Sequence, residues 1–138
     1  MAPHYSGMPM FERLDYIYTP SRDVAADLAW FTTVLGGRAV FAIEAMGTRV
    51  AAVDLTPEAP RIVLADHLDG DRPILVYRVE DLDVATQELK TLGWEAGHAL
   101  EIPQGPVHSF EGPGGHRVAI YQLTRPGVET SFEGRRDF

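Results

Sequence analysis

The sequence has 138 residues, no cysteine and a formal net charge of −8 at pH 7. These values exclude disulfide bonds, thiolate catalysis and cysteine-based zinc sites, and the 12 Lys and Arg residues are too scattered to form a phosphate-binding surface for nucleic acid. No segment approaches the roughly 20 apolar residues of a membrane span, so we expect a single-domain, cytoplasmic protein without a membrane or nucleic-acid partner.

The first half of the chain predicts the order strand, helix and three strands. Residues 1–11 lack periodicity and are expected to form a flexible N-terminal arm. A first module is expected over residues 12–67. Its predicted elements are a strand over 12–19, a helix over 24–35, a hairpin of strands over 38–45 and 49–55, and a strand over 61–67.

The predicted helix of this module has clear start and stop residues. Asp23 can accept hydrogen bonds from the free backbone N–H groups at the helix start. Apolar residues follow at i, i+4, i+7 and i+11, which places them on one face; they are Val24, Leu28, Phe31 and Leu35. Gly36 can adopt the left-handed conformation that ends a helix.

The second half of the chain repeats this order after a polar linker over residues 68–73. Asp81 stands at the predicted helix start and Gly93 at its end, and the matching spacing indicates an internal duplication. The second module is expected over residues 74–123. Its predicted elements are a strand over 74–79, a helix over 82–92, and strands over 94–102, 107–110 and 117–123. The tail, residues 124–138, either docks as a short helix or stays mobile.

Two βαβββ modules in this order resemble the vicinal oxygen chelate superfamily, which includes glyoxalases, ring-cleaving dioxygenases and bleomycin-resistance proteins. Three segments carry the resemblance: Asp23 to Gly36 with its aromatic pair, the VEDLD of Val79 to Asp83, and the FEGPGGHRVAIY of Phe110 to Tyr121. The resemblance implies an α+β fold in which the two modules form a curved mixed sheet with a cleft. It also implies a homodimer, since members with one pair of modules per chain commonly pair across two chains.

In metal-dependent members of this superfamily, His, Gln or Glu side chains from both modules hold one divalent ion in the cleft. The resemblance places these four positions at Tyr16, Val63, Ile74 and Ala119. A divalent ion needs converging nitrogen or oxygen donors, which three of these residues lack. We therefore expect no metal and no cofactor at this position.

Other donors could in principle build a non-standard metal site. The nearby candidates are Glu44, Asp66, His67, Glu101 and His108. Strand alternation gives His67 the same facing as Val63, which points it toward the cleft mouth. A surface histidine is the simpler interpretation, and the facing of Glu44 and His108 stays open.

Strand alternation also predicts the residues that line the cleft. The expected ligand-binding residues are Tyr16, Tyr18, Val63, His67, Ile74, Val76, Arg78, Arg117, Ala119 and Tyr121. A mostly aromatic and apolar lining with a few polar groups is typical of small-molecule sites. The alternative is that these side chains only fill the cleft as a second core.

Three functions follow from this reading. The leading hypothesis is a metal-free protein, similar to bleomycin-resistance proteins, that binds an aromatic or amphipathic small molecule such as an antibiotic. The alternative is a lyase, isomerase or dioxygenase-like enzyme that uses Tyr16, His67 or Tyr121 as acid or base, or a non-standard metal site. The third is a scaffold used only in protein contacts.

Overall fold

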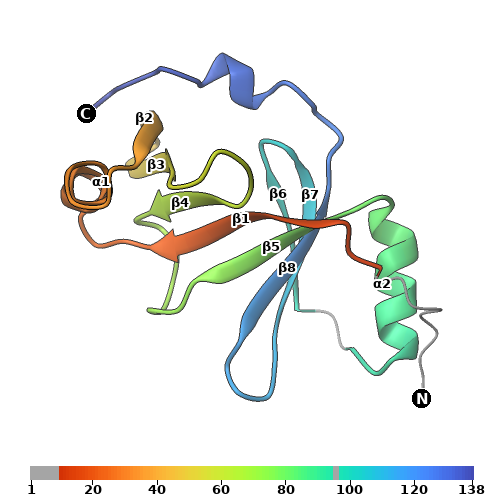
Figure 1. The fold of residues 1–138 in the computed structure, drawn as a ribbon. Coiled ribbons are helices and arrows are strands. Elements are labelled where there is room, and N and C mark those ends of the chain that lie inside the picture. Colours follow the sequence, from red (N-terminus) through yellow and green to blue (C-terminus); the bar gives the residue numbers. More distant parts are fainter. Residues whose placement is uncertain (1–9, 95–96) are drawn as a thin grey trace.

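The computed structural model describes residues 10–94 and 97–138, so nearly all of the expected N-terminal arm lies outside the described residues. Eight strands form one mixed sheet in the order β2-β3-β4-β1-β5-β8-β7-β6, and it curves into a half-barrel with two helices (Figure 1). The elements are β1 Arg13–Pro20, α1 Val24–Thr33, β2 Arg38–Ala45, β3 Thr48–Asp54, β4 Arg61–Ala65, β5 Ile74–Val79, α2 Leu82–Thr91, β6 His98–Ile102, β7 Gly105–Glu111 and β8 Arg117–Gln122. The predicted α+β fold is confirmed.

The two modules meet at the antiparallel pair of β1 and β5 in the middle of the sheet. Each of these strands also pairs in parallel with the last strand of its own module, β4 or β8. The registers of these two parallel pairs correspond. Tyr18 lies opposite Val63 in the first module, and at the equivalent positions of the second module Val76 lies opposite Ala119. The sheet therefore has the internal repeat that the sequence predicts.

Both helices begin where the sequence predicts. The side chain of Asp23 accepts from the Ala26 N–H at 3.0 Å, and that of Asp81 accepts from the Val84 N–H at 3.1 Å. Gly93, directly after α2, has a φ of +101°, a conformation that side chains other than glycine rarely adopt. The first helix is shorter than predicted: it ends at Thr33, and the turn that follows leaves Leu35 47% exposed instead of on the buried face.

The helices cover the outer face of the sheet. Val24 and Leu28 of α1 pack on Ala51 and Leu64, and Leu82 of α2 packs in a cluster that contains buried residues of the second module. Phe11, expected in the arm, belongs to the edge of this second cluster, with its ring centroid 5.3 Å from that of Tyr77. Side chains alternate between the two faces of a strand. The strand residues next in sequence to these packed residues therefore point to the opposite, concave face of the sheet.

Two strands of the second module differ from their predicted bounds. β6 begins at His98 and not at Trp94, and two of the intervening residues lie outside the described part of the chain. β7 begins at Gly105 and is longer than predicted. In the described part of the chain, neither helix is long and apolar enough to cross a membrane.

The tail docks, and it contains the short 3-10 helix Glu129–Ser131. It then runs beside the edge strand β2, where Ala42 donates to the Arg135 carbonyl at 2.8 Å and accepts from the Asp137 N–H at 2.7 Å. Figure 1 shows this tail passing from the end of β8 across to the side of the sheet that carries β2. The tail therefore spans the two modules and covers one sheet edge.

Candidate functional site

A pocket of about 480 Å³ lies on the concave face of the sheet. Its walls come from both modules, from the loop between β6 and β7, and from the tail. Most of the lining side chains are apolar: Phe41, Ile43 and Val50 from the first module, Ile74, Val76, Val107 and Ala119 from the second, and Phe132 from the tail. The Phe41 and Phe132 ring centroids lie 5.8 Å apart, so the tail closes this pocket by direct packing.

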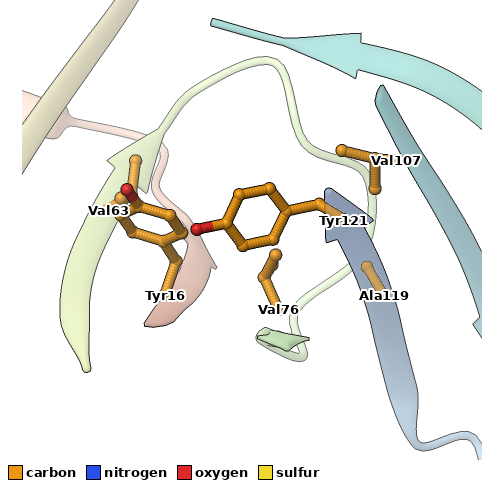
Figure 2. Packing of buried hydrophobic residues seen from close by; sticks show 6 residues of the cluster. All are labelled: Tyr16, Val63, Val76, Val107, Ala119 and Tyr121. Atoms are coloured by element: carbon orange, nitrogen blue, oxygen red, sulfur yellow. The ribbon is translucent and has the colours of Figure 1, made fainter. Parts of the chain in front are cut away.

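A buried cluster joins the strands at this pocket and contributes part of its lining (Figure 2). Its members are at most 6% exposed and comprise Tyr16, Val63, Val76, Val107, Ala119 and Tyr121. The rings of Tyr16 and Tyr121 lie next to each other, with centroids 5.8 Å apart. Three of the four expected metal positions thus meet in one cluster, and the fourth, Ile74, packs against it.

Each of these two tyrosines donates a hydrogen bond to a carboxylate. Tyr16 donates to Glu129 of the tail, whose other carboxylate oxygen lies 2.8 Å from Arg61 Nη1. Arg61 also binds Asp54 with two hydrogen bonds, at 2.7 and 3.0 Å. This network connects β1, β3, β4 and the tail.

The hydrogen bond of the second tyrosine, Tyr121, depends on a bulge in β1. The register between β1 and β5 shifts between Leu14 and Tyr16, which leaves Asp15 as the extra residue. Asp15 is 5% exposed and accepts from the Tyr121 hydroxyl at 2.5 Å. Arg13 Nε lies 2.5 Å from the other carboxylate oxygen, so the buried charge is paired.

A smaller, mixed-charge pocket of about 370 Å³ lies around these pairs. Its charged lining residues balance in number, with four arginines and four acids: Arg13, Arg61, Arg78, Arg125, Asp15, Asp54, Glu58 and Glu129. Gln104 and Glu129 line this pocket and the apolar pocket alike. The polar and apolar parts of the concave face therefore meet at these two residues.

The three tyrosines of the concave face are neutral hydrogen-bond donors at neutral pH. Burial, together with the Glu129 carboxylate, raises the pKa of Tyr16 far above its ordinary value. Burial also raises the pKa of Tyr18, with a further contribution from Glu129. Burial and the hydrogen bond to Asp15 raise the pKa of Tyr121. None of these phenols is poised to act as a base.

The structure divides the predicted ligand-binding residues among three places. The apolar pocket is lined by Tyr18, Val63, His67, Ile74, Val76 and Ala119. The mixed-charge pocket is lined by Tyr16, Arg78 and Tyr121. Arg117 lines a third pocket, of about 650 Å³, where its guanidinium donates to the carbonyls of Asp69 and Arg72, at 2.6 and 2.9 Å, and holds the linker between the modules.

The candidate metal donors do not converge. His108 faces away from the cleft, because its Nδ1 lies 2.9 Å from Thr86 Oγ1 of α2. Glu44 is exposed and pairs with Arg49 at 2.6 Å. His67 is exposed at the pocket wall. Within residues 10–94 and 97–138, no three His, Asp or Glu side chains are grouped to hold a metal ion.

The four expected metal positions do not fit a divalent ion either. Val63, Ile74 and Ala119 carry no donor atom, and the Tyr16 hydroxyl is already bonded to Glu129. Nitrogen or oxygen donors are required for such an ion. The donor set of the cluster therefore disagrees with the metal chemistry of the superfamily that the sequence resembles.

Three of the site residues missing from the predicted set are polar groups at or beside the pockets: Asp15, Gln104 and Glu129. Asp15 was missed because simple alternation points it to the helical face, and only the bulge turns it inward. Gln104 lies in a turn and Glu129 in the tail, where no strand pattern assigns a facing. The one available signal was the presence of isolated apolar residues in the tail, Val128 and Phe132, which indicated docking.

No family model matches the sequence, and no curated protein matches it either. Solved structures do resemble the fold. Methylmalonyl-CoA epimerase from Mycobacterium tuberculosis has a TM-score of 0.70 at 20% identity, covering 88% of this chain and 94% of that chain. A hypothetical protein from Bacillus halodurans has a TM-score of 0.68 at 15% identity, covering 80% and 93%.

A Streptomyces coelicolor methylmalonyl-CoA epimerase variant in complex with 2-nitronate-propionyl-CoA has a TM-score of 0.66 at 14% identity, covering 83% of this chain and 99% of that chain. At these identities the likeness concerns the fold. The matching architecture is one curved, mixed sheet of eight strands that forms a half-barrel with two helices. The chain therefore has the glyoxalase-type fold of the vicinal oxygen chelate superfamily, to which methylmalonyl-CoA epimerase belongs.

Proposed function

We propose that the chain binds an aromatic or amphipathic small molecule in the apolar pocket of the concave face. The observation that carries this proposal is a pocket of about 480 Å³ walled by both modules and the tail, with a mostly apolar lining and a few polar groups. Ligand pockets of proteins typically have this size and composition. An antibiotic is one molecule of this class.

The proposed binding does not use a metal ion at the superfamily's position, because three of the four residues there carry no donor atom and the Tyr16 hydroxyl is bonded to Glu129. Charged groups near the pocket pair with each other: Glu129 with Arg61, and Glu101 with Arg125 at 2.5 Å. A ligand held mainly by apolar contacts is consistent with such a lining. A cytoplasmic location and a homodimer are part of the same proposal.

The second candidate function is catalysis by an isomerase, and the comparisons favour it over binding alone. The named structural neighbours are epimerases, one of them in complex with methylmalonyl-CoA. An isomerase that moves a proton needs an acid–base group within hydrogen-bond reach of its substrate. The apolar pocket is lined by the imidazole of His67 and the carboxylate of Glu129, two side-chain types that act as general bases, whereas burial raises the pKa of Tyr16 and Tyr18 and keeps these phenols protonated.

Binding is tested with 2-naphthol, an aromatic probe whose own fluorescence reports its surroundings. Ile43→Trp adds volume at the wall of the pocket and should abolish binding, whereas Val84→Trp on α2, at a side chain 53% exposed, should leave it unchanged. Binding that survives Ile43→Trp would place the site elsewhere. Mass spectrometry of the purified protein would identify any molecule that stays bound.

Turnover is tested with methylmalonyl-CoA in heavy water. An isomerase would exchange the proton next to the carbonyl for deuterium, and His67→Ala or Glu129→Gln should slow that exchange if the residue is the base. Binding without exchange supports the binding protein. Exchange that both variants leave unchanged would exclude these two residues as the base.

A further inference from the structure

The side chain of Gln104 is buried, and its amide oxygen has no hydrogen-bond partner in the described part of the chain. Gln104 lies in the turn between β6 and β7, is 6% exposed, and its Oε1 has no hydrogen-bond partner among the described residues. Most buried side-chain oxygens in proteins are hydrogen-bonded, because an unpaired one loses its interaction with water and gains nothing in return. This amide therefore calls for a function outside the fold itself.

The turn that carries Gln104 is held firmly. Its backbone carbonyl accepts from the N–H groups of Thr124 and Arg125, both at 3.1 Å. The Arg125 guanidinium donates to the carbonyls of Pro103 and Ile102, at 2.6 and 2.8 Å. The unpaired amide thus belongs to a fixed turn.

Gly105 shows how closely the turn packs. A Cβ at this position would lie 1.9 Å from the Gln122 carbonyl oxygen of β8, a distance that no side chain can adopt. The chain therefore has glycine directly after Gln104, where the backbone of the turn meets β8. This close packing helps to fix the backbone of the turn next to Gln104.

Gln104 stands where the apolar and mixed-charge pockets meet. It and Glu129 are the residues common to the linings of both pockets. The apolar pocket holds few other polar groups deep in its wall, since Glu101 and His67 are exposed. Gln104 and Glu129 thus bring an amide and a carboxylate to the wall that the two pockets share.

We propose that Gln104 recognises the polar group of the ligand: the ligand has an aromatic or apolar body in the larger pocket and an N–H or O–H donor that binds Gln104 Oε1, beside Glu129. This inference rests on the proposed binding function and specifies its ligand class. An amphipathic molecule with an amine, amide or hydroxyl group next to its apolar body fits this arrangement. A purely apolar molecule leaves the amide unpaired.

The inference is tested with two probes of nearly the same shape. 2-Naphthol donates an O–H, and 2-methoxynaphthalene cannot. We expect the wild-type protein to bind 2-naphthol about tenfold more tightly, the ratio that one net hydrogen bond supplies. Gln104→Met should bind both probes equally, whereas Gln87→Met on the exposed side of α2 should keep the wild-type preference.

The outcomes separate this inference from the proposed function. If Ile43→Trp leaves probe binding unchanged, the pocket is not the site, and both proposals fail. If the wild type binds the two probes equally, or Gln104→Met keeps the preference, the role of Gln104 is overturned while the pocket stands as the binding site.

Thermal unfolding provides the structural control. Because the amide oxygen has no hydrogen-bond partner among the described residues, Gln104→Met and Gln104→Leu should melt no lower than the wild type. A clearly lower melting temperature of both variants, or their failure to fold, would show that the amide stabilises the protein itself and would overturn the inference.

Discussion

Tyr16 in the first strand donates a hydrogen bond to Glu129 in the tail, although the two residues are 113 positions apart in the chain. Arg61 completes the arrangement by pairing with the same carboxylate at 2.8 Å. The tail is therefore attached to the centre of the sheet through a partly buried, charge-assisted network, in addition to its backbone hydrogen bonds with β2.

Removal of the Tyr16 hydroxyl should loosen this attachment. Tyr16→Phe keeps the ring in the buried cluster but leaves Glu129 without its neutral donor, so we expect a loss of about 1 to 3 kcal/mol of unfolding free energy, measured by urea denaturation. Tyr18→Phe is the matched control, since the ring centroid of Tyr18 lies 6.1 Å from that of Tyr16. This change should lower the unfolding free energy by less.

A double-mutant cycle with Glu129→Gln separates the stability contributed by the Tyr16–Glu129 hydrogen bond from that contributed by the packing of the Tyr16 ring. If the two residues stabilise the protein together, the effects of Tyr16→Phe and Glu129→Gln should deviate from additivity by at least about 0.5 kcal/mol. Additive effects would contradict an energetic link between the first strand and the tail.

Asp54 should make the stability of the protein dependent on acid pH. Burial by itself raises the pKa of Asp54, but hydrogen bonds from Arg61 and Arg38 outweigh burial and lower the pKa below its ordinary value. Since the folded-state pKa lies below the unfolded-state value of about 3.9, the ionised Asp54 stabilises the fold fully above that value. This contribution is lost as the pH falls through the folded-state pKa.

Asp54→Asn tests this dependence. At pH 7 we expect the variant to be about 1.5 to 3 kcal/mol less stable than the wild type, since hydrogen bonds to a charged carboxylate are lost. As the pH falls from the unfolded-state pKa through the folded-state pKa of Asp54, the difference should shrink because the wild-type carboxylate takes up a proton. A difference that stays constant between neutral and acid pH would contradict the assigned role of the charge.

The expected metal positions allow a gain-of-function experiment. Tyr16→His, Ile74→His and Ala119→Glu combined should place nitrogen and oxygen donors where the resemblance puts the superfamily's ligands. Without metal, unpaired polar groups in this apolar cluster cost about 1 to 3 kcal/mol each. The triple variant should therefore melt at a lower temperature than the wild type.

Added Zn²⁺ or Ni²⁺ should then raise the melting temperature of the triple variant only. A ligand that binds the folded state stabilises it by about 2.7 kcal/mol at about a hundred-fold excess over its Kd. Absence of this rescue would show that the assigned positions are wrong. Stoichiometric metal in the wild-type protein, measured by elemental analysis, would reveal a site of different residues.

We expect a homodimer in solution. The tail covers the outer edge of β2, but β6 lies at the other end of the sheet, and its residue Leu100 is 45% exposed. An uncovered edge strand with an apolar side chain is a surface that a second chain can pair with. Light scattering over a wide concentration range should give the dimer mass, and Leu100→Lys should weaken it. A monomer mass throughout would contradict the expectation.

The elements of this protein could be predicted because their signals are local. Asp23 and Asp81 start the helices, Gly36 and Gly93 follow their ends, and the spacing between these residues repeats. A helix start needs only a side-chain acceptor within one turn, so the residues themselves carry the information. The resemblance to a known fold followed from the same short segments.

The composition of the site was decided by tertiary structure. Strand alternation correctly placed Val63, Val76 and Ala119 on the concave face, because alternation is a property of each strand alone. Asp15 faces inward because a bulge forms only when β1 pairs with β5. Gln104 and Glu129 reach the pocket because a turn and a tail fold back onto the sheet, and contacts between residues so far apart in sequence depend on how the whole chain packs.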